Sequence, residues 1–267
     1  MLVDMHFHID SKWHNPELVG KTLADIEKNR MLVAANSTDI SSYFETLEIS
    51  KRSDFVFPAF GILPWYAHEH YEKLDEIEIP LNEVGMLGEI GIDYKHSPAE
   101  AEPHMQKALF EFFLAAAEKH DLILNNHVRG DETFKDARDI LGSYNLKRVI
   151  MHSHYEQPEG MRELADRGYY FTVGQGFVEY RDDEASNRIK NAVREIPNDA
   201  LLVEVDTIPR EGWVPPSSKL KSLLDNLAEF RGVSIEELED IVHRNSLRLL
   251  RGVEQIEQYV KLLESGV

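Results

Sequence analysis

The chain has 267 residues, with 29 lysines and arginines against 48 aspartates and glutamates, and a formal net charge of −19. Such a negative field repels polyanions, so tight binding to duplex nucleic acid is not expected. Cysteine is absent, which excludes disulfides and thiolate metal sites and fits a reducing compartment. No apolar run reaches the roughly 18 residues of a transmembrane helix, and the first residues carry no basic segment typical of a signal peptide. We therefore expect a cytoplasmic protein without a membrane partner.

Short apolar runs rich in β-branched residues recur along the chain and predict eight strands, at residues 2–8, 31–36, 55–62, 84–92, 122–128, 148–154, 169–173 and 201–205. Apolar side chains at three- and four-residue spacing predict intervening helices, at residues 99–120, 131–141, 158–167, 183–195, 217–231 and 235–250. This alternation predicts an α/β protein, a single (β/α)₈ TIM barrel over residues 1–267. A doubly wound open sheet is the main alternative, but no G-x-G-x-x-G follows the first run.

Functional residues of such a barrel gather at the carboxyl ends of its strands. Candidate residues lie at five predicted strand ends: His6, His8, Glu89, His127, His152, His154 and Asp206. His6 and His8 are two residues apart, so their imidazoles share one face of a strand, and Asp4 is expected on the same face. By the same alternation, His154 shares the inward face with His152. The remaining histidines fall in predicted loops or helices and are interpreted as ordinary polar residues: His14, His68, His70, His96, His104, His120 and His243.

The residue types at these strand ends indicate a metal site. Neutral imidazole and carboxylate suit zinc, manganese, iron or magnesium. A catalytic zinc ion usually takes three protein ligands, and structural zinc sites prefer cysteine. The surplus of ligands therefore predicts two divalent ions bridged by a carboxylate, and Glu89 is the natural bridge.

Several segments together resemble the TatD-type metal-dependent hydrolases, which are (β/α)₈ barrels of the amidohydrolase-like superfamily. The segments are residues 4–10 (DMHFHID), 88–94 (GEIGIDY), 127–129 (HVR), 151–152 (MH), 204–207 (EVDT) and 245–249 (NSLRL). The resemblance implies that His6, His8 and Glu89 hold one ion, and that Glu89, His127 and His152 hold the second. It also implies that Asp206 lies beside the first ion and the attacking water, and that Arg129 lies near the substrate anion. Family members are described as deoxyribonucleases or phosphodiesterases.

The chain departs from the family pattern in three loops. Leu63 stands where the family usually has the histidine of a Gly-x-His-Pro motif. That histidine is associated with engaging substrate, so this departure affects the expected substrate handling and leaves the predicted metal ligands unchanged. Residues 153–156 (SHYE) replace an aromatic-small-glycine turn, and residues 207–209 (TIP) lack the Ser-Pro of the family.

These residues predict divalent-metal-dependent hydrolysis of a small phosphodiester or single-stranded DNA. Asp206 and Glu89 are the predicted catalytic residues, and Asp206 would orient the water and accept its proton. Arg129 offers a fork of donors that matches phosphate, and His154 and Asp93 are further predicted substrate contacts. Two alternatives remain: cleavage of a C–N bond or carboxylic ester by the same metal site, or a metal-binding barrel without turnover. Related barrels that cleave such bonds often bridge their ions with a carbamylated lysine, so Glu89 favours phosphodiesters.

Overall fold

The computed structural model describes residues 1–155, 158–179, 184–206 and 213–266. The strands are β1 (Leu2–Phe7), β2 (Met31–Asn36), β3 (Val56–Ala59), β4 (Met86–Asp93), β5 (Ile123–Arg129), β6 (Val149–Met151), β7 (Tyr170–Val173) and β8 (Leu201–Val203). The α-helices are α1 (Pro16–Asn29), α2 (Ile40–Ser50), α3 (Ala67–His70), α4 (Pro103–His120), α5 (Asp131–Leu141), α6 (Pro158–Asp166), α7 (Gly176–Glu179), α8 (Glu184–Glu195), α9 (Pro216–Arg231), α10 (Ile235–Leu250) and α11 (Glu257–Ser265). Within the described residues, none of the helices combines the length and apolar character needed to cross a membrane.

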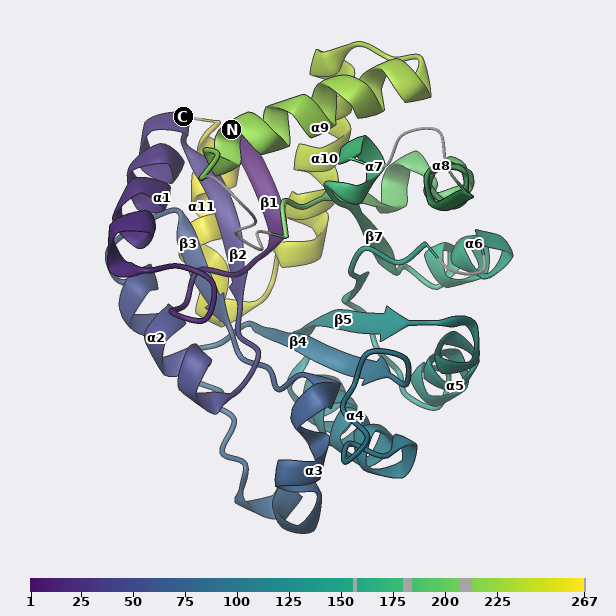
Figure 1. Ribbon diagram of the computed structural model, residues 1–267. Coiled ribbons are helices and arrows are strands. Elements are labelled where there is room, and N and C mark those ends of the chain that lie inside the picture. Colours follow the sequence, from purple (N-terminus) through teal and green to yellow (C-terminus); the bar gives the residue numbers. More distant parts are fainter. Residues whose placement is uncertain (156–157, 180–183, 207–212, 267) are drawn as a thin grey trace.

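All strand pairings are parallel, and they form two sheets, β1-β2-β3 and β4-β5-β6-β7-β8. The sheets meet where Phe60, just after β3, pairs with Leu87 on β4. On the opposite side, the backbone N–H of Asp206 donates to the carbonyl of His6 at 3.1 Å. Helices surround the strands on the outside (Figure 1). The predicted alternation of eight strands with helices is confirmed.

Asp4 helps to join the two ends of this ring. Its carboxylate accepts hydrogen bonds from the backbone N–H of His6 at 3.1 Å and from that of Val205 at 3.2 Å. Burial raises the pKa of the Asp4 carboxyl well above its usual value. The side chain expected beside the histidines therefore binds backbone groups of β1 and of the segment after β8.

A change of register in β1 positions the histidines. The pairing with β2 shifts between Asp4 and Phe7. Val3, before the shift, and Met5, within it, belong to the core inside the barrel, whereas Phe7 belongs to the core between strands and helices. The inward positions at the carboxyl end of β1 are consequently taken by polar residues.

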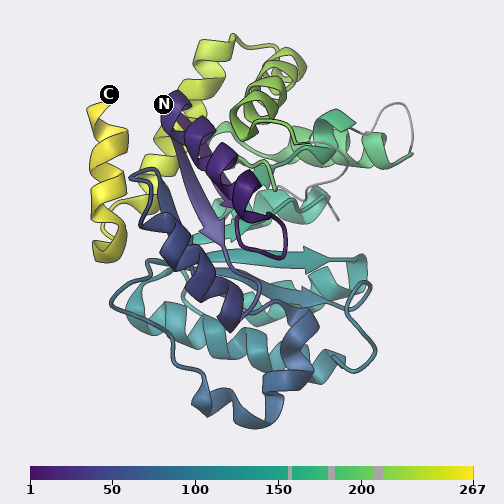
Figure 2. The same cartoon turned by 60° about the vertical axis from the view of Figure 1, so that its left-hand side comes forward.

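The C-terminal segment closes the other end of the barrel interior. Leu250, Ile256 and Leu263 pack into the same apolar core as the inward side chains of the strands. The hydroxyl of Tyr259 donates to the carbonyl of Val56 at 3.1 Å. Figures 1 and 2 show α10 and α11 on the side of the molecule where the N-terminus lies. Apolar packing at this end leaves the polar chemistry to the carboxyl ends of the strands.

Gly91 permits the close approach of β4 to β5. Its φ is +148°, and a Cβ there would lie 1.9 Å from the carbonyl oxygen of His127. We expect Gly91→Ala to lower the free energy of unfolding by about 3 kcal/mol, because backbone strain and overpacking each cost about 1–3 kcal/mol. Urea denaturation followed by circular dichroism measures this change.

Gly20→Ala is the matched control. A Cβ at Gly20 would meet nothing within 4 Å, and the residue lies inside α1. Replacing a helical glycine by alanine stabilises by about 0.5–1 kcal/mol. Equal stability of the Gly91→Ala protein and the native protein would contradict this account of the β4–β5 contact.

Candidate metal centre

The six predicted metal ligands meet at the carboxyl ends of the strands, and we call them the metal centre: His6, His8, Glu89, His127, His152 and Asp206. The first five are buried, whereas the Asp206 side chain is 29% exposed. Their nitrogen and oxygen atoms form groups within 4.8 Å of one another that could hold an ion. The structure therefore brings together side chains from strand ends that lie up to 200 positions apart in the sequence.

The Glu89 carboxylate lies between two pairs of histidines. Its Oε2 is 3.1 Å from Nε2 of His8 and 3.6 Å from Nε2 of His6. Its Oε1 is 2.5 Å from Nδ1 of His127 and 3.6 Å from Nε2 of His152. Each carboxylate oxygen thus faces its own histidine pair, which is the arrangement that a carboxylate bridging two ions requires.

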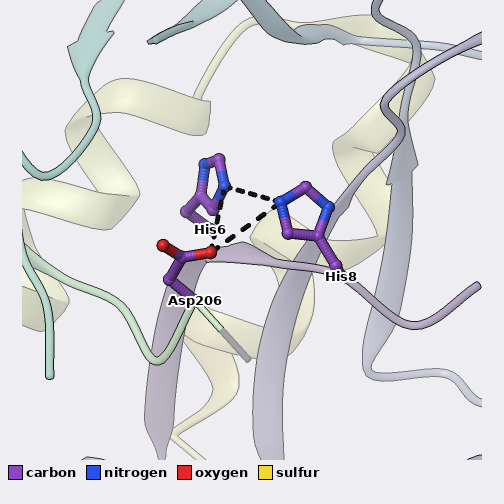
Figure 3. A group of neighbouring side chains, drawn as sticks. All are labelled: His6, His8 and Asp206. Atoms are coloured by element: carbon purple, nitrogen blue, oxygen red, sulfur yellow. Dashed lines mark hydrogen bonds and ion pairs between the residues drawn. The ribbon is translucent and has the colours of Figure 1, made fainter. Parts of the chain in front are cut away.

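Asp206, whose side chain is partly exposed, faces three of these four histidines. Figure 3 shows its carboxylate directed at the Nε2 atoms of His6 and His8, with Oδ1 at 3.8 Å from both. Its other oxygen, Oδ2, is 3.8 Å from Nε2 of His152. Two ligands about 2.1 Å from one ion at a tetrahedral angle are about 3.4 Å apart. The separations of 3.6–3.8 Å that Glu89 makes with His6 and His152, and Asp206 with His6, His8 and His152, are too long for direct hydrogen bonds and fit shared ions.

The outer ring nitrogen of each histidine is held by an acceptor. The pairs are His6 Nδ1 with Asn125 Oδ1 at 3.0 Å, His8 Nδ1 with the Asn36 carbonyl at 2.9 Å, His152 Nδ1 with Glu204 Oε2 at 2.8 Å, and His127 Nε2 with Asp93 Oδ2 at 3.0 Å. An acceptor at one nitrogen keeps the proton there and turns the lone pair of the other nitrogen inward. This donor set fits divalent cations, because all four rings can offer a lone pair toward Glu89 or Asp206.

The electrostatics of the centre divide the histidines into two groups. Burial lowers the pKa of His6 to about 4 and that of His152 to about 3, so both are neutral at pH 7. Burial also lowers the pKa of His8, but the hydrogen bond with Glu89 and the charges of Glu89, Asp206 and Asp10 together outweigh burial and raise this pKa to about 9. Burial is likewise outweighed at His127, where Glu89 and Asp93 together raise the pKa. Binding of a cation at His8 or His127 would therefore release protons.

Asp93 positions His127. The carboxylate is buried, and its Oδ1 accepts from the backbone N–H of Lys95 at 3.1 Å and from that of His96 at 2.9 Å. Burial opposes its ionisation, but the hydrogen bond to His127 lowers the pKa of Asp93 below its usual value. Asp93 was predicted to contact substrate, whereas the structure directs its carboxylate at the outer nitrogen of His127, a predicted metal ligand.

His154 does not join the centre. β6 ends at Met151, and Ser153 has a φ of +37°, so the strand alternation that placed His154 beside His152 does not continue. The buried His154 ring instead stacks on Phe134 of α5, with ring centroids 4.5 Å apart. The predicted shared inward face was therefore wrong.

Arg129 lies at the centre but contacts protein groups. Its Nη1 donates to the carbonyl of His152 at 2.9 Å and to that of Ser153 at 3.1 Å. Its Nη2 is 2.8 Å from Nε2 of His152. Arg129, the predicted phosphate donor, is thus anchored beside His152, whose Nε2 faces Oε1 of Glu89.

Glu204 was missed as a site residue. Glu204 is buried. Its carboxylate accepts hydrogen bonds from Nδ1 of His152 and from the Ser153 hydroxyl. Burial raises the pKa of Glu204. An acidic residue between two apolar positions at the end of a buried strand was the available signal, but that signal does not identify its partner.

We expect Asp93→Ala to weaken the binding of a divalent ion at His127 by about 10- to 100-fold, the usual effect of losing an outer-sphere partner of a histidine ligand. Titration of metal-stripped protein with Mn²⁺ against a chelating indicator measures the affinity. Asp136→Ala is the control, because Asp136 bonds Tyr94 and Lys107 on the surface. Native-like affinity in the Asp93→Ala protein would contradict the positioning role.

The profile of the family described as TatD related DNase matches residues 3–251. The chain belongs to this family. The resemblance drawn from the sequence is therefore confirmed, and the profile spans the whole metal centre.

Individual members of the TatD family are similar along nearly their full length. The chain is 27% identical to the uncharacterized metal-dependent hydrolase YabD of Bacillus subtilis, covering 94% of this chain and 99% of YabD. It is 20% identical to the human deoxyribonuclease TATDN3, covering 93% and 94% of the two chains. The crystal structure of YJJV, a TatD homolog from Escherichia coli, superposes with a TM-score of 0.77 at 19% identity, covering 93% and 97%. This last likeness confirms the predicted fold class.

Proposed function

We propose that this TatD-family protein is a divalent-metal-dependent hydrolase that cleaves phosphodiester bonds in small or single-stranded nucleic-acid substrates. The observation that carries the proposal is the Glu89 carboxylate, whose two oxygens each face a separate histidine pair. Membership of the family supports hydrolysis with metal, and the deoxyribonuclease name of TATDN3 supports the phosphodiester.

Two divalent ions bound at such a site would supply activation of a water molecule near neutral pH and neutralisation of charge on the phosphoryl oxygens. The residues that would hold them are His6, His8, Glu89 and Asp206 for one ion, and Glu89, His127 and His152 for the other. Asp206 is the exposed carboxylate of the centre, so it orients the attacking water and accepts its proton. Arg129 lies within the same centre and supplies donors to an anionic oxygen of the substrate.

The net charge of the chain limits the range of nucleic-acid substrates. A net charge of −19 disfavours long duplexes, whose binding needs many cations along the phosphates. A single cleavable phosphodiester needs fewer such contacts. Cleavage of carboxylic esters or C–N bonds is the second candidate, and the carboxylate at Glu89, where related barrels often carry a modified lysine, favours the phosphodiester.

The test is hydrolysis by metal-stripped protein before and after adding Zn²⁺, Mn²⁺ or Mg²⁺. The substrates are a chromogenic phosphodiester, labelled single-stranded and duplex oligonucleotides, a lactone and an N-acyl amide. We expect phosphodiester cleavage only with metal, and faster cleavage of single strands than of duplexes. Metal uptake with turnover of the lactone or amide alone would contradict the proposal.

A further inference from the structure

Arg129 occupies the lone pair of a metal ligand. The Nδ1–H of His152 donates to Glu204, so Nε2 of the same ring carries a lone pair. Nη2 of Arg129 is 2.8 Å from this Nε2 and donates to it. The guanidinium is held in place from the other side, where Nη1 donates to the carbonyls of His152 and Ser153.

The same lone pair is the one that an ion on this side of the centre needs. Nε2 of His152 is the ring atom that faces Glu89 Oε1 at 3.6 Å and Asp206 Oδ2 at 3.8 Å. An imidazole nitrogen has one lone pair in the ring plane, so an N–H donor and a cation cannot both use it. The fixed positive charge of Arg129 also repels a divalent cation strongly at a buried site.

The other side of the centre has no such competitor. The Nε2 atoms of His6 and His8 are 3.2 Å apart and face Glu89 Oε2. Within the part of the chain that the structure describes, no lysine or arginine donates to either nitrogen. The two histidine pairs therefore differ in their electrostatic surroundings although they share one carboxylate.

We propose that Arg129 makes the two ion positions unequal and orders their loading. The first ion binds at His6 and His8. The second ion, at His127 and His152, binds more weakly because it must displace the Arg129 guanidinium from His152. The displaced Nη2 stays beside the centre through the Nη1 anchors, so binding of the second ion frees the donor that a substrate phosphate needs. This inference rests on the two-ion site of the proposed function.

The test is calorimetric titration of metal-stripped protein with Mn²⁺, which reports binding without any substrate. We expect two events in the native protein, the second weaker by at least about tenfold, the scale of outer-sphere effects on metal affinity. Arg129→Met removes the charge but keeps an unbranched side chain, and it is expected to tighten the second event by about tenfold and leave the first unchanged. Arg129→Lys keeps the charge, so the inequality is expected to persist in part.

Two further variants make the result specific. His127→Asn is expected to remove the weak event and keep the tight one, which assigns the events to the two sides. Arg138→Met is the control, because Arg138 lies on α5, where it pairs with its neighbour Asp139. Thermal unfolding of each stripped variant shows whether it has kept the native fold.

The outcomes separate this inference from the function on which it rests. Equal affinities in the native protein, or a second event that Arg129→Met leaves unchanged or weakens, would overturn the ordered loading and leave the two-ion site intact. One ion in the native protein and two in the Arg129→Met protein would support it. One ion in both proteins would contradict the two-ion site itself.

Discussion

Replacing Glu89 by glutamine is expected to remove at least one ion per chain and to lower phosphodiester turnover by at least about 10³-fold, which corresponds to about 4 kcal/mol of lost transition-state stabilisation. Glutamine keeps the shape of the side chain but replaces one oxygen with an amide that donates hydrogen bonds. Because each Glu89 oxygen faces its own histidine pair, one side of the centre loses its Glu89 oxygen whichever way the amide turns.

Metal content by mass spectrometry and the initial rate at saturating Mn²⁺ measure the two effects of Glu89→Gln together. Glu83→Gln is the matched control, because the Glu83 carboxylate accepts from the Tyr43 hydroxyl away from the centre. A Glu89→Gln protein that retains two ions and full turnover would show that this carboxylate does not bridge them.

Asp206→Asn is expected to retain both ions and to lower turnover by about 10²- to 10⁴-fold, the usual contribution of a general base. The backbone of Asp206 is fixed by its hydrogen bond to the carbonyl of His6, which asparagine keeps. The amide cannot accept a proton from water. Ion binding and kcat at saturating metal separate the two roles of this residue.

The control for Asp206→Asn is Asp225→Asn, a change on the exposed face of α9. Full activity of the Asp206→Asn protein would exclude Asp206 as proton acceptor. Loss of the ions together with turnover would assign the residue to metal binding alone.

The fold and the proximity of the predicted metal ligands could be predicted because both depend on local patterns. Apolar runs mark buried strands, and the barrel geometry places their carboxyl ends at one rim. His6 and His8 were recognisable as a pair from their spacing, and the other ligands from their positions at strand ends. The lengths of β3 and β6 were overestimated, because strand-like residues continue in the sequence after the backbone has left the strand. In β6 the backbone turns at Ser153, which has a positive φ.

The surroundings of the ligands were not predictable, because they depend on which way a side chain points after its strand ends. The outer partner of His6 is Asn125, 119 residues away, and that of His152 is Glu204, 52 residues away. Period-two alternation failed for His154 for the same reason: the strand had already ended. Arg129 was predicted to lie near the substrate anion, which stays a prediction; its contact with His152 depends on the packing of β5 against β6 and had no signal in the sequence.

The most direct test of the account is turnover of a phosphodiester as a function of the number of Mn²⁺ ions bound per chain. Metal-stripped protein is loaded stepwise, and bound metal and initial rate are measured on the same samples. The account predicts a negligible rate up to one ion per chain, a rise as the second ion binds, and a plateau at two. Full activity at one ion, or two bound ions without phosphodiester hydrolysis, would contradict it.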